Sequence, residues 1–159
     1  MSKRLTAVVV IVLVVLVGGT VAHAQTGSGT ETTLSGKGYL KASGSGSVAI
    51  EMSGIITLAA DGDVTIVDHS GDARVHIVAP GARAAGAEEL GREPSYELRD
   101  FQGVVRVIGS DFAIDAEGFS ALRARGRGSA DLTGEGVWKT RAGWGFWTED
   151  GVRLDLESE

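Results

Sequence analysis

Apolar and polar residues alternate along residues 35–58, which is the clearest pattern in the chain. Most odd positions hold a polar residue, whereas the even positions hold glycine or an apolar residue: Gly36, Gly38, Leu40, Ala42, Gly44, Gly46, Val48, Ile50, Met52, Gly54, Ile56 and Leu58. A period of two is typical of half-buried β-strands. Because this run is far longer than an ordinary strand, we expect it to bend at its glycine pairs.

Turn-forming residues divide the rest of the chain into short segments of strand-like pattern. We expect turns at Asp61-Gly62, His69-Ser70-Gly71, Gly109-Ser110, Glu117-Gly118, Arg141-Ala142-Gly143 and Asp150-Gly151. Short consecutive strands joined by tight turns predict an antiparallel meander. The predicted fold class is therefore all-β, as a β-sandwich or as a small closed β-barrel or roll.

The two halves of the chain resemble each other. One constant shift along the sequence aligns Gly44 with Gly126 and Gly54 with Gly136, with apolar residues matching between them. A duplicated β-unit would explain this similarity, and so would two glycine-rich strands under one packing constraint.

The N-terminal segment has the features of an export signal. Lys3 and Arg4 precede an unbroken apolar run over residues 7–17, and a small-x-small site follows at Ala22 and Ala24. The apolar run is shorter than the ~20 residues that a spanning helix needs. We therefore predict a signal helix over residues 1–24, cleaved after Ala24 by the general secretory route. The alternative is an uncleaved anchor that tethers the domain to a membrane.

Behind this segment we expect one domain. Residues 25–34 are rich in Gly, Ser and Thr and predict a flexible lead-in, and residues 35–157 predict a single β-rich domain with a mobile loop at 80–95. The chain has no Cys and 24 Gly, so this domain has to be held by its sheet and core without disulfides. Together with the predicted export signal, this favours a periplasmic, cell-surface or secreted protein.

Charge narrows the choice of partners. The formal net charge is −6, and loss of Lys3 and Arg4 makes it two units more negative. Nucleic-acid binding rests on basic charge, so we expect no nucleic-acid partner. A glycan or another envelope polymer, or self-association through edge strands, remains open.

Nothing in the sequence predicts catalysis. His69 and His76 are the histidines of the predicted domain, and neither lies in a nucleophile elbow or at a zinc spacing. Asp61, Asp63 and Asp72 are weak calcium candidates, because the position that needs glycine in a calcium loop holds isoleucine. We therefore expect no enzyme activity, no metal and no cofactor.

Three tryptophans, Trp138, Trp144 and Trp147, lie close together in the sequence. We expect Trp138 and Trp144 to fill the core. For Trp147 two positions remain open, one in the core and one at the surface, where a sugar ring could stack on it. Trp144 should share a strand face with Phe146, with Trp147 on the other face.

Three arginines, Arg123, Arg125 and Arg127, fall on one strand face at a period of two. This ladder could hold a polyanionic wall polymer or a lipid headgroup. The structural alternative, which we favour, is pairing with acidic residues of the preceding strand across a hairpin, namely Asp111, Asp115 and Glu117.

The first functional hypothesis is an exported, non-enzymatic β-domain of the cell envelope or extracellular space that acts as a structural or interaction module. One alternative is a module that binds carbohydrate or a wall polymer through exposed tryptophan and the arginine ladder. A second alternative is a small outer-membrane β-barrel, disfavoured because one face would meet lipid with mostly Gly and Ala.

Overall fold

The computed structural model describes residues 33–35, 38–79 and 95–157. The predicted signal segment with Ala22 and Ala24, most of the lead-in and residues 80–94 of the loop lie outside these ranges. The strands are β1 (Thr33–Ser35), β2 (Tyr39–Asp68), β3 (Arg74–Val78), β4 (Ser95–Thr140), β5 (Trp144–Trp147) and β6 (Val152–Leu156). The described part of the chain contains no helix long and apolar enough to cross a membrane.

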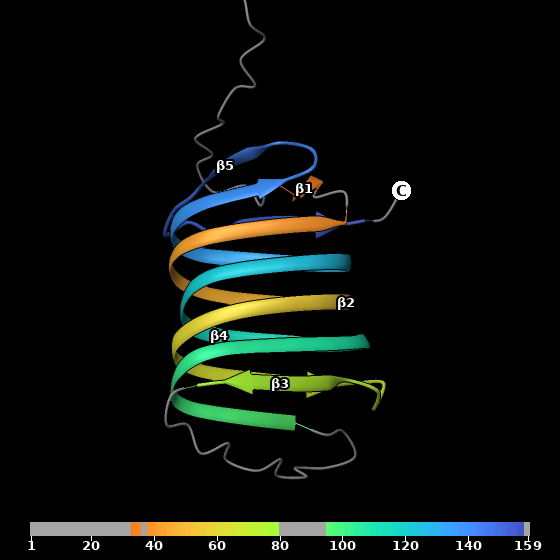
Figure 1. The fold of residues 1–159 in the computed structure, drawn as a ribbon. Helices are drawn as coiled ribbons and strands as arrows, with labels where there is room; N and C mark the ends of the chain where they lie inside the picture. The colour runs from red at the N-terminus through yellow and green to blue at the C-terminus, as the bar shows by residue number, and fades with distance from the viewer. Residues whose placement is uncertain (1–32, 36–37, 80–94, 158–159) are drawn as a thin grey trace, which may run out of the picture.

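Two very long strands, β2 with 30 residues and β4 with 46, wind together into a coil (Figure 1). They pair in antiparallel fashion, and most residues of β2 have a β4 partner on each side. Ile50 lies opposite Ile114 on one side and opposite Ala130 on the other. The stretch of β4 from Ile114 to Ala130 therefore makes one full turn, and residues half a turn apart lie on opposite faces of the coil.

The coil turns its corners at glycines. Gly46, Gly54 and Gly62 recur at a constant interval in β2, and they lie opposite or beside Gly134, Gly126 and Gly118, which recur at the same interval in β4. At Gly54, φ is 142°, and a Cβ there would overlap the Arg125 carbonyl oxygen and lie 2.9 Å from the Gly126 Cα. Positive φ and close backbone approach both require glycine. Both strands thus bend together at each corner without losing their pairing.

The interior of the coil is filled by alternate side chains, which are the even-numbered ones throughout β2, as the alternation predicts, and odd-numbered ones in parts of β4, such as Phe101 and Phe119. Leu40, Ile50, Ile56 and Leu58 are at most 1% exposed, and the core continues through residues of β4 and β6, including Phe112, Ile114, Phe119, Leu132, Leu154 and Leu156. The expected bend at a glycine pair is confirmed at Gly46, and Gly54, which lies outside the pairs, forms a further corner.

Several expected turns are corners or continuous strand instead. Asp61-Gly62 lies within β2, and Gly109-Ser110 and Glu117-Gly118 lie within β4. The predicted meander is therefore wrong, because the pairing is between two long strands and not between successive short ones. The all-β antiparallel class is confirmed, but the sheet does not close into a barrel.

The C-terminal turns are confirmed. At Arg141-Ala142-Gly143 the chain reverses into β5, and the Thr140 amide donates to the Gly143 carbonyl at 2.8 Å. At Asp150-Gly151 the Gly151 amide donates to the Thr148 carbonyl at 2.9 Å.

The short strands complete the ends of the coil. β6 pairs antiparallel with β4 and parallel with β1, so residues 33 and 34 of the expected lead-in belong to the sheet. Ser95, placed in the predicted loop, begins β4. Within the described residues β3 and β5 each pair with β4 alone. Self-association through such edges stays a prediction.

Candidate functional site

Basic side chains from four β2 and β4 segments line up across one face of the coil. Following the cross-strand pairs from β3 to β5 gives a row that we call the cationic row: His76, Arg106, Thr57, Arg123, Lys41, Lys139 and Trp144. All of these residues are exposed except Thr57, which is half-buried. Neighbouring strands lie ~4.8 Å apart, so the row is roughly 29 Å long.

A second row runs beside the first and adds Arg74 and Arg125. Its cross-strand order is Arg74, Ile108, Ile55, Arg125 and Tyr39. We use the term cationic face for the surface that carries the basic residues of both rows: Lys41, Arg74, His76, Arg106, Arg123, Arg125 and Lys139. No Asp or Glu occurs in the described strand segments that build it, which are 39–43, 55–59, 74–78, 104–108, 121–125, 137–139 and 144–146.

The arrangement places like charges side by side. Lys41 lies directly opposite Arg123 on one side and Lys139 on the other. Like charges directly opposite each other destabilise a sheet. The Tyr39 ring offsets part of this repulsion, because the guanidinium carbons of Arg123 and Arg125 lie 5.9 and 5.8 Å from its centroid. Because these basic side chains repel one another, the cationic face is a candidate site for an anionic ligand, whose charge would relieve the repulsion.

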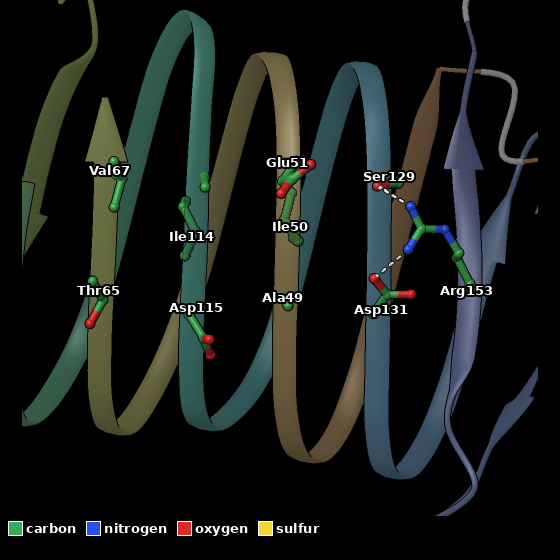
Figure 2. A pocket seen from close by; sticks show the side chains of 11 residues that line it. Ala49, Ile50, Glu51, Thr65, Val67, Ile114, Asp115, Ser129, Asp131 and Arg153 are labelled. Carbon is green, nitrogen blue, oxygen red and sulfur yellow. Dashed lines mark hydrogen bonds and ion pairs between the residues drawn. The ribbon is translucent and has the colours of Figure 1, made fainter. Parts of the chain in front are cut away.

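The opposite face, half a turn away, is acidic. Its strand segments carry Glu51, Asp63, Glu97, Asp115, Glu117, Asp131 and Asp155, together with Arg99 and Arg153. Figure 2 shows part of this face, where Glu51, Asp115 and Asp131 surround a hollow of about 280 Å³. The two faces therefore differ in the sign of their charge.

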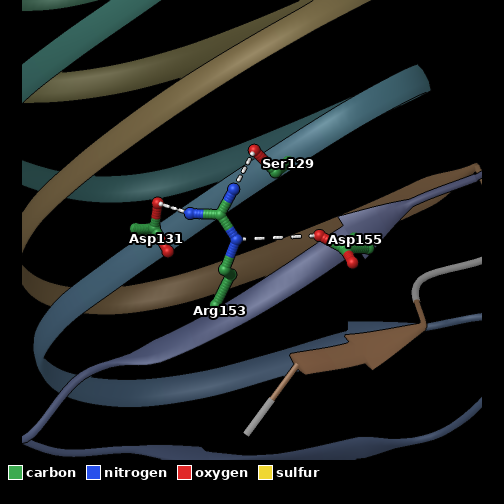
Figure 3. A network of polar contacts seen from close by, with 4 residues as sticks. All are labelled: Ser129, Asp131, Arg153 and Asp155. Carbon is green, nitrogen blue, oxygen red and sulfur yellow. Dashed lines mark hydrogen bonds and ion pairs between the residues drawn. The ribbon is translucent and has the colours of Figure 1, made fainter. Parts of the chain in front are cut away.

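Arg153 is tied into the acidic face (Figure 3). Its guanidinium donates to Asp131 at 2.9 Å and to Ser129 at 3.2 Å, and its Nε lies 3.8 Å from Asp155. These groups are about 40% exposed, and exposed ion pairs contribute little to stability. Arg153 is thus balanced by carboxylates, whereas Arg123 and Arg125 of the cationic face contact the Tyr39 ring.

The three arginines of the predicted ladder do not share one surface in the structure. Arg123 and Arg125 lie on the cationic face, whereas Arg127 lies at a corner opposite Ser53. The favoured pairing with Asp111, Asp115 and Glu117 is wrong, because the chain does not reverse at Glu117-Gly118. Asp115 instead lies opposite Ala49 and Thr65, on the acidic face.

Of the three tryptophans, only Trp144 differs from its expected position. Trp138 is 8% exposed, as predicted for a core residue, but Trp144 is 66% exposed. Trp147 is 2% exposed and stacks on Phe119 with centroids 5.7 Å apart. The hypothesis of a sugar stacking on Trp147 is therefore wrong, because its indole faces the core.

Glycines decide which aromatic rings are buried. A Cβ added at Gly136 would overlap the indole of Trp147, so the bare backbone there makes room for that ring. Likewise a Cβ added at Gly145 would lie 2.6 Å from Cζ2 of the Trp138 indole. Trp144 and Phe146 share the outer face of β5, as predicted, and form an edge-to-face pair with centroids 5.6 Å apart.

The calcium candidates do not converge. Asp63 accepts the Asp100 amide at 2.9 Å. Asp72 instead accepts the Ser110 amide at 2.9 Å and the Ser70 hydroxyl at 2.7 Å, and these bonds lower the pKa of its carboxyl from 3.8. Among the described residues no group of three or more His, Cys, Asp or Glu side chains could hold a metal ion. The weak calcium interpretation is therefore not supported.

His69 and His76 do not line the hollow on the acidic face or the second hollow beside Phe146. His76 stands in the cationic row, and the His69 amide donates to the Asp111 carbonyl at 3.1 Å.

Five basic residues of the cationic face were missed by the sequence analysis: Lys41, Arg74, His76, Arg106 and Lys139. One signal could have revealed part of the row, because Arg106, Arg123 and Lys139 recur at nearly equal intervals. This spacing is close to the length of one turn of the coil, from Ile114 to Ala130. Comparisons with protein-family models, curated proteins and solved structures find no match to this chain.

Proposed function

We propose that this protein is an exported, non-enzymatic interaction module that binds an anionic polymer of the cell envelope through the cationic face. The observation that carries the proposal is Lys41, which lies directly between Arg123 and Lys139. This repulsive arrangement is unfavourable in the free protein and becomes favourable when a ligand supplies negative charge.

A polymer suits this surface better than a compact ion. The basic groups of the cationic row, from His76 to Lys139, span roughly 24 Å, and they line neither the hollow on the acidic face nor the one beside Phe146. A chain with repeated negative charges can contact several of them at once, and each contact adds to the affinity of the others. The acidic face repels the same polymer, so only one face of the coil binds it.

The proposal is tested with two purified probes, poly(glucuronic acid) and poly(glycerol phosphate), by isothermal titration at low salt. The double variant Arg123→Gln/Arg125→Gln should weaken binding about five- to thirtyfold, if each exposed contact contributes about 0.5–1 kcal/mol. The matched control is Arg99→Gln/Arg153→Gln, which removes the same charge from the acidic face and should leave the affinity unchanged or slightly improved. Binding should also weaken steeply as salt is raised.

The proposal fails if the protein binds neither polymer, or if both double variants change the affinity equally. Equal effects would mean that net charge alone, and not the cationic face, governs binding.

Export is tested separately by mass spectrometry of the protein recovered from its native host. A mature N-terminus at Gln25 supports a cleaved signal. An N-terminus at Met1 would contradict cleavage and support a membrane-tethered domain.

A further inference from the structure

An exposed aromatic pair stands at one end of the cationic face. Trp144 and Phe146 are 66% and 63% exposed, although five other aromatic residues are buried: Phe101, Phe112, Phe119, Trp138 and Trp147. The two rings contact each other edge to face, with centroids 5.6 Å apart. Large apolar side chains that remain in water as a contiguous patch mark interaction surfaces.

The pair continues the rows of the sheet. Trp144 lies opposite Lys139 and is the last member of the cationic row. Phe146 lies opposite Val137 and ends the neighbouring row, whose order is Val78, Val104, Ala59, Ala121, Ser43, Val137 and Phe146. This row carries no charge. A ligand that follows the cationic row therefore reaches the aromatic pair without leaving the surface.

A shallow hollow lies beside Phe146. Gly44, Gly136, Val137 and Trp147 also line it, together with three residues that have polar side chains, Ser45, Glu135 and Thr148. An apolar surface bordered by hydroxyl and carboxylate groups fits a sugar ring, because its C–H face packs on aromatic carbon while its hydroxyls hydrogen-bond.

We propose that the ligand of the cationic face is an acidic glycan, with acid groups on the basic residues and one sugar ring against Trp144 and Phe146. This inference rests on the proposed function and names its ligand class. A membrane of anionic lipid presents charge of the same sign, and the experiments below separate it from a glycan. A phosphate polymer without sugar rings would leave the aromatic pair unused.

The decisive variant is Trp144→Ala/Phe146→Ala. Its affinity for an oligoglucuronate of six to eight sugars should fall about five- to twentyfold, from the contribution typical of an aromatic contact. Its affinity for poly(glycerol phosphate) should change less than about twofold, since charge governs that contact. The matched control, Val78→Ala, removes an exposed apolar side chain at the other end of the same row and should leave glycan binding unchanged. Unchanged thermal unfolding verifies that the exposed substitutions leave the fold intact.

Fluorescence gives an independent readout. Trp144 is the exposed tryptophan of the described three, so oligoglucuronate should shift its emission to shorter wavelength, and Trp144→Phe should abolish the shift.

Three outcomes would overturn the inference. If Trp144→Ala/Phe146→Ala binds oligoglucuronate like wild type while Arg123→Gln/Arg125→Gln does not, the aromatic subsite is refuted and the proposed function stands. If the aromatic variant loses binding to phosphatidylglycerol vesicles but not to the glycan, the surface is a membrane site. If wild type binds none of the probes, the proposed function fails as well.

Discussion

Alanine at Gly54 tests the coil most directly, because this residue forms a corner with Gly126. The backbone at Gly54 has φ 142°, and an added Cβ would overlap the Arg125 carbonyl oxygen. A non-glycine residue in such a conformation costs about 1–3 kcal/mol before any steric overlap is added. Gly54→Ala should therefore lower the free energy of unfolding by at least about 2 kcal/mol. For a domain of this size, that loss lowers Tm by roughly 6–12 °C.

The control is Gly143→Ala, because a Cβ at Gly143 meets nothing within 4 Å. Its effect should stay within about 1 kcal/mol in either direction. Urea unfolding followed by tryptophan fluorescence measures both variants, since Trp138 and Trp147 are buried and report the loss of the core.

The double variant Gly54→Ala/Gly126→Ala tests whether the two glycines form one corner. A Cβ at Gly126 would lie 2.9 Å from the Gly54 Cα, so the first substitution already separates the strands that the second would separate. The combined loss should be smaller than the sum of the single losses by about 0.5–3 kcal/mol. Strict additivity, or a Gly54→Ala variant as stable as Gly143→Ala, would refute the corner geometry.

Three further outcomes are expected from equilibrium unfolding. Trp147→Ala should cost about 3–5 kcal/mol because the ring is 2% exposed, whereas Trp144→Ala should cost less than about 0.5 kcal/mol; equal costs would contradict the assignment of the buried ring. Asp72→Asn should lower stability at neutral pH and less so in acid. The hydrogen bonds that lower the Asp72 pKa stabilise the folded state above its ordinary value of 3.8, and this stabilisation is lost as the pH falls through the lower folded value; a stability difference independent of pH would refute it. Arg153→Gln should cost less than about 1 kcal/mol, since its pairs with Asp131 and Asp155 are about 40% exposed; a larger loss would show that this network is a structural anchor.

The alternation of inward and outward side chains could be predicted from the sequence, but the path of the strands could not. Alternation depends only on the pleat, so Leu40, Ile50 and Leu58 are buried whichever strand lies beside them. A hairpin turn, where the chain reverses, and a corner, where one strand bends and continues, can however have the same local sequence. Asp61-Gly62 has the composition of a hairpin turn, yet β2 continues because Gly118 lets the adjacent segment of β4 bend at the same place.

The candidate site was only partly predictable for the same reason. Arg123 and Arg125 are neighbours on one side of the pleat and share a face in any strand. Lys41 joins them only through pairing between β2 and β4, whose segments are far apart in the chain, and that register is absent from local sequence. Trp144 and Trp147 were correctly predicted on opposite faces of one strand. Which face is buried depends on Gly136, a cross-strand neighbour that makes room for the Trp147 ring.

The spacing of the corner glycines has a consequence for how such a protein can change in length. Gly46, Gly54 and Gly62 are separated by an even number of positions, so an insertion of one corner-to-corner length keeps every later side chain on its own side of the pleat. It nevertheless moves those residues by half a turn, from the cationic to the acidic face. Only an insertion of twice that length, matched in the partner strand, restores both burial and charge. Insertions and deletions in related sequences should therefore occur in steps of one full turn, and each added turn would lengthen the row of basic residues by two strand spacings.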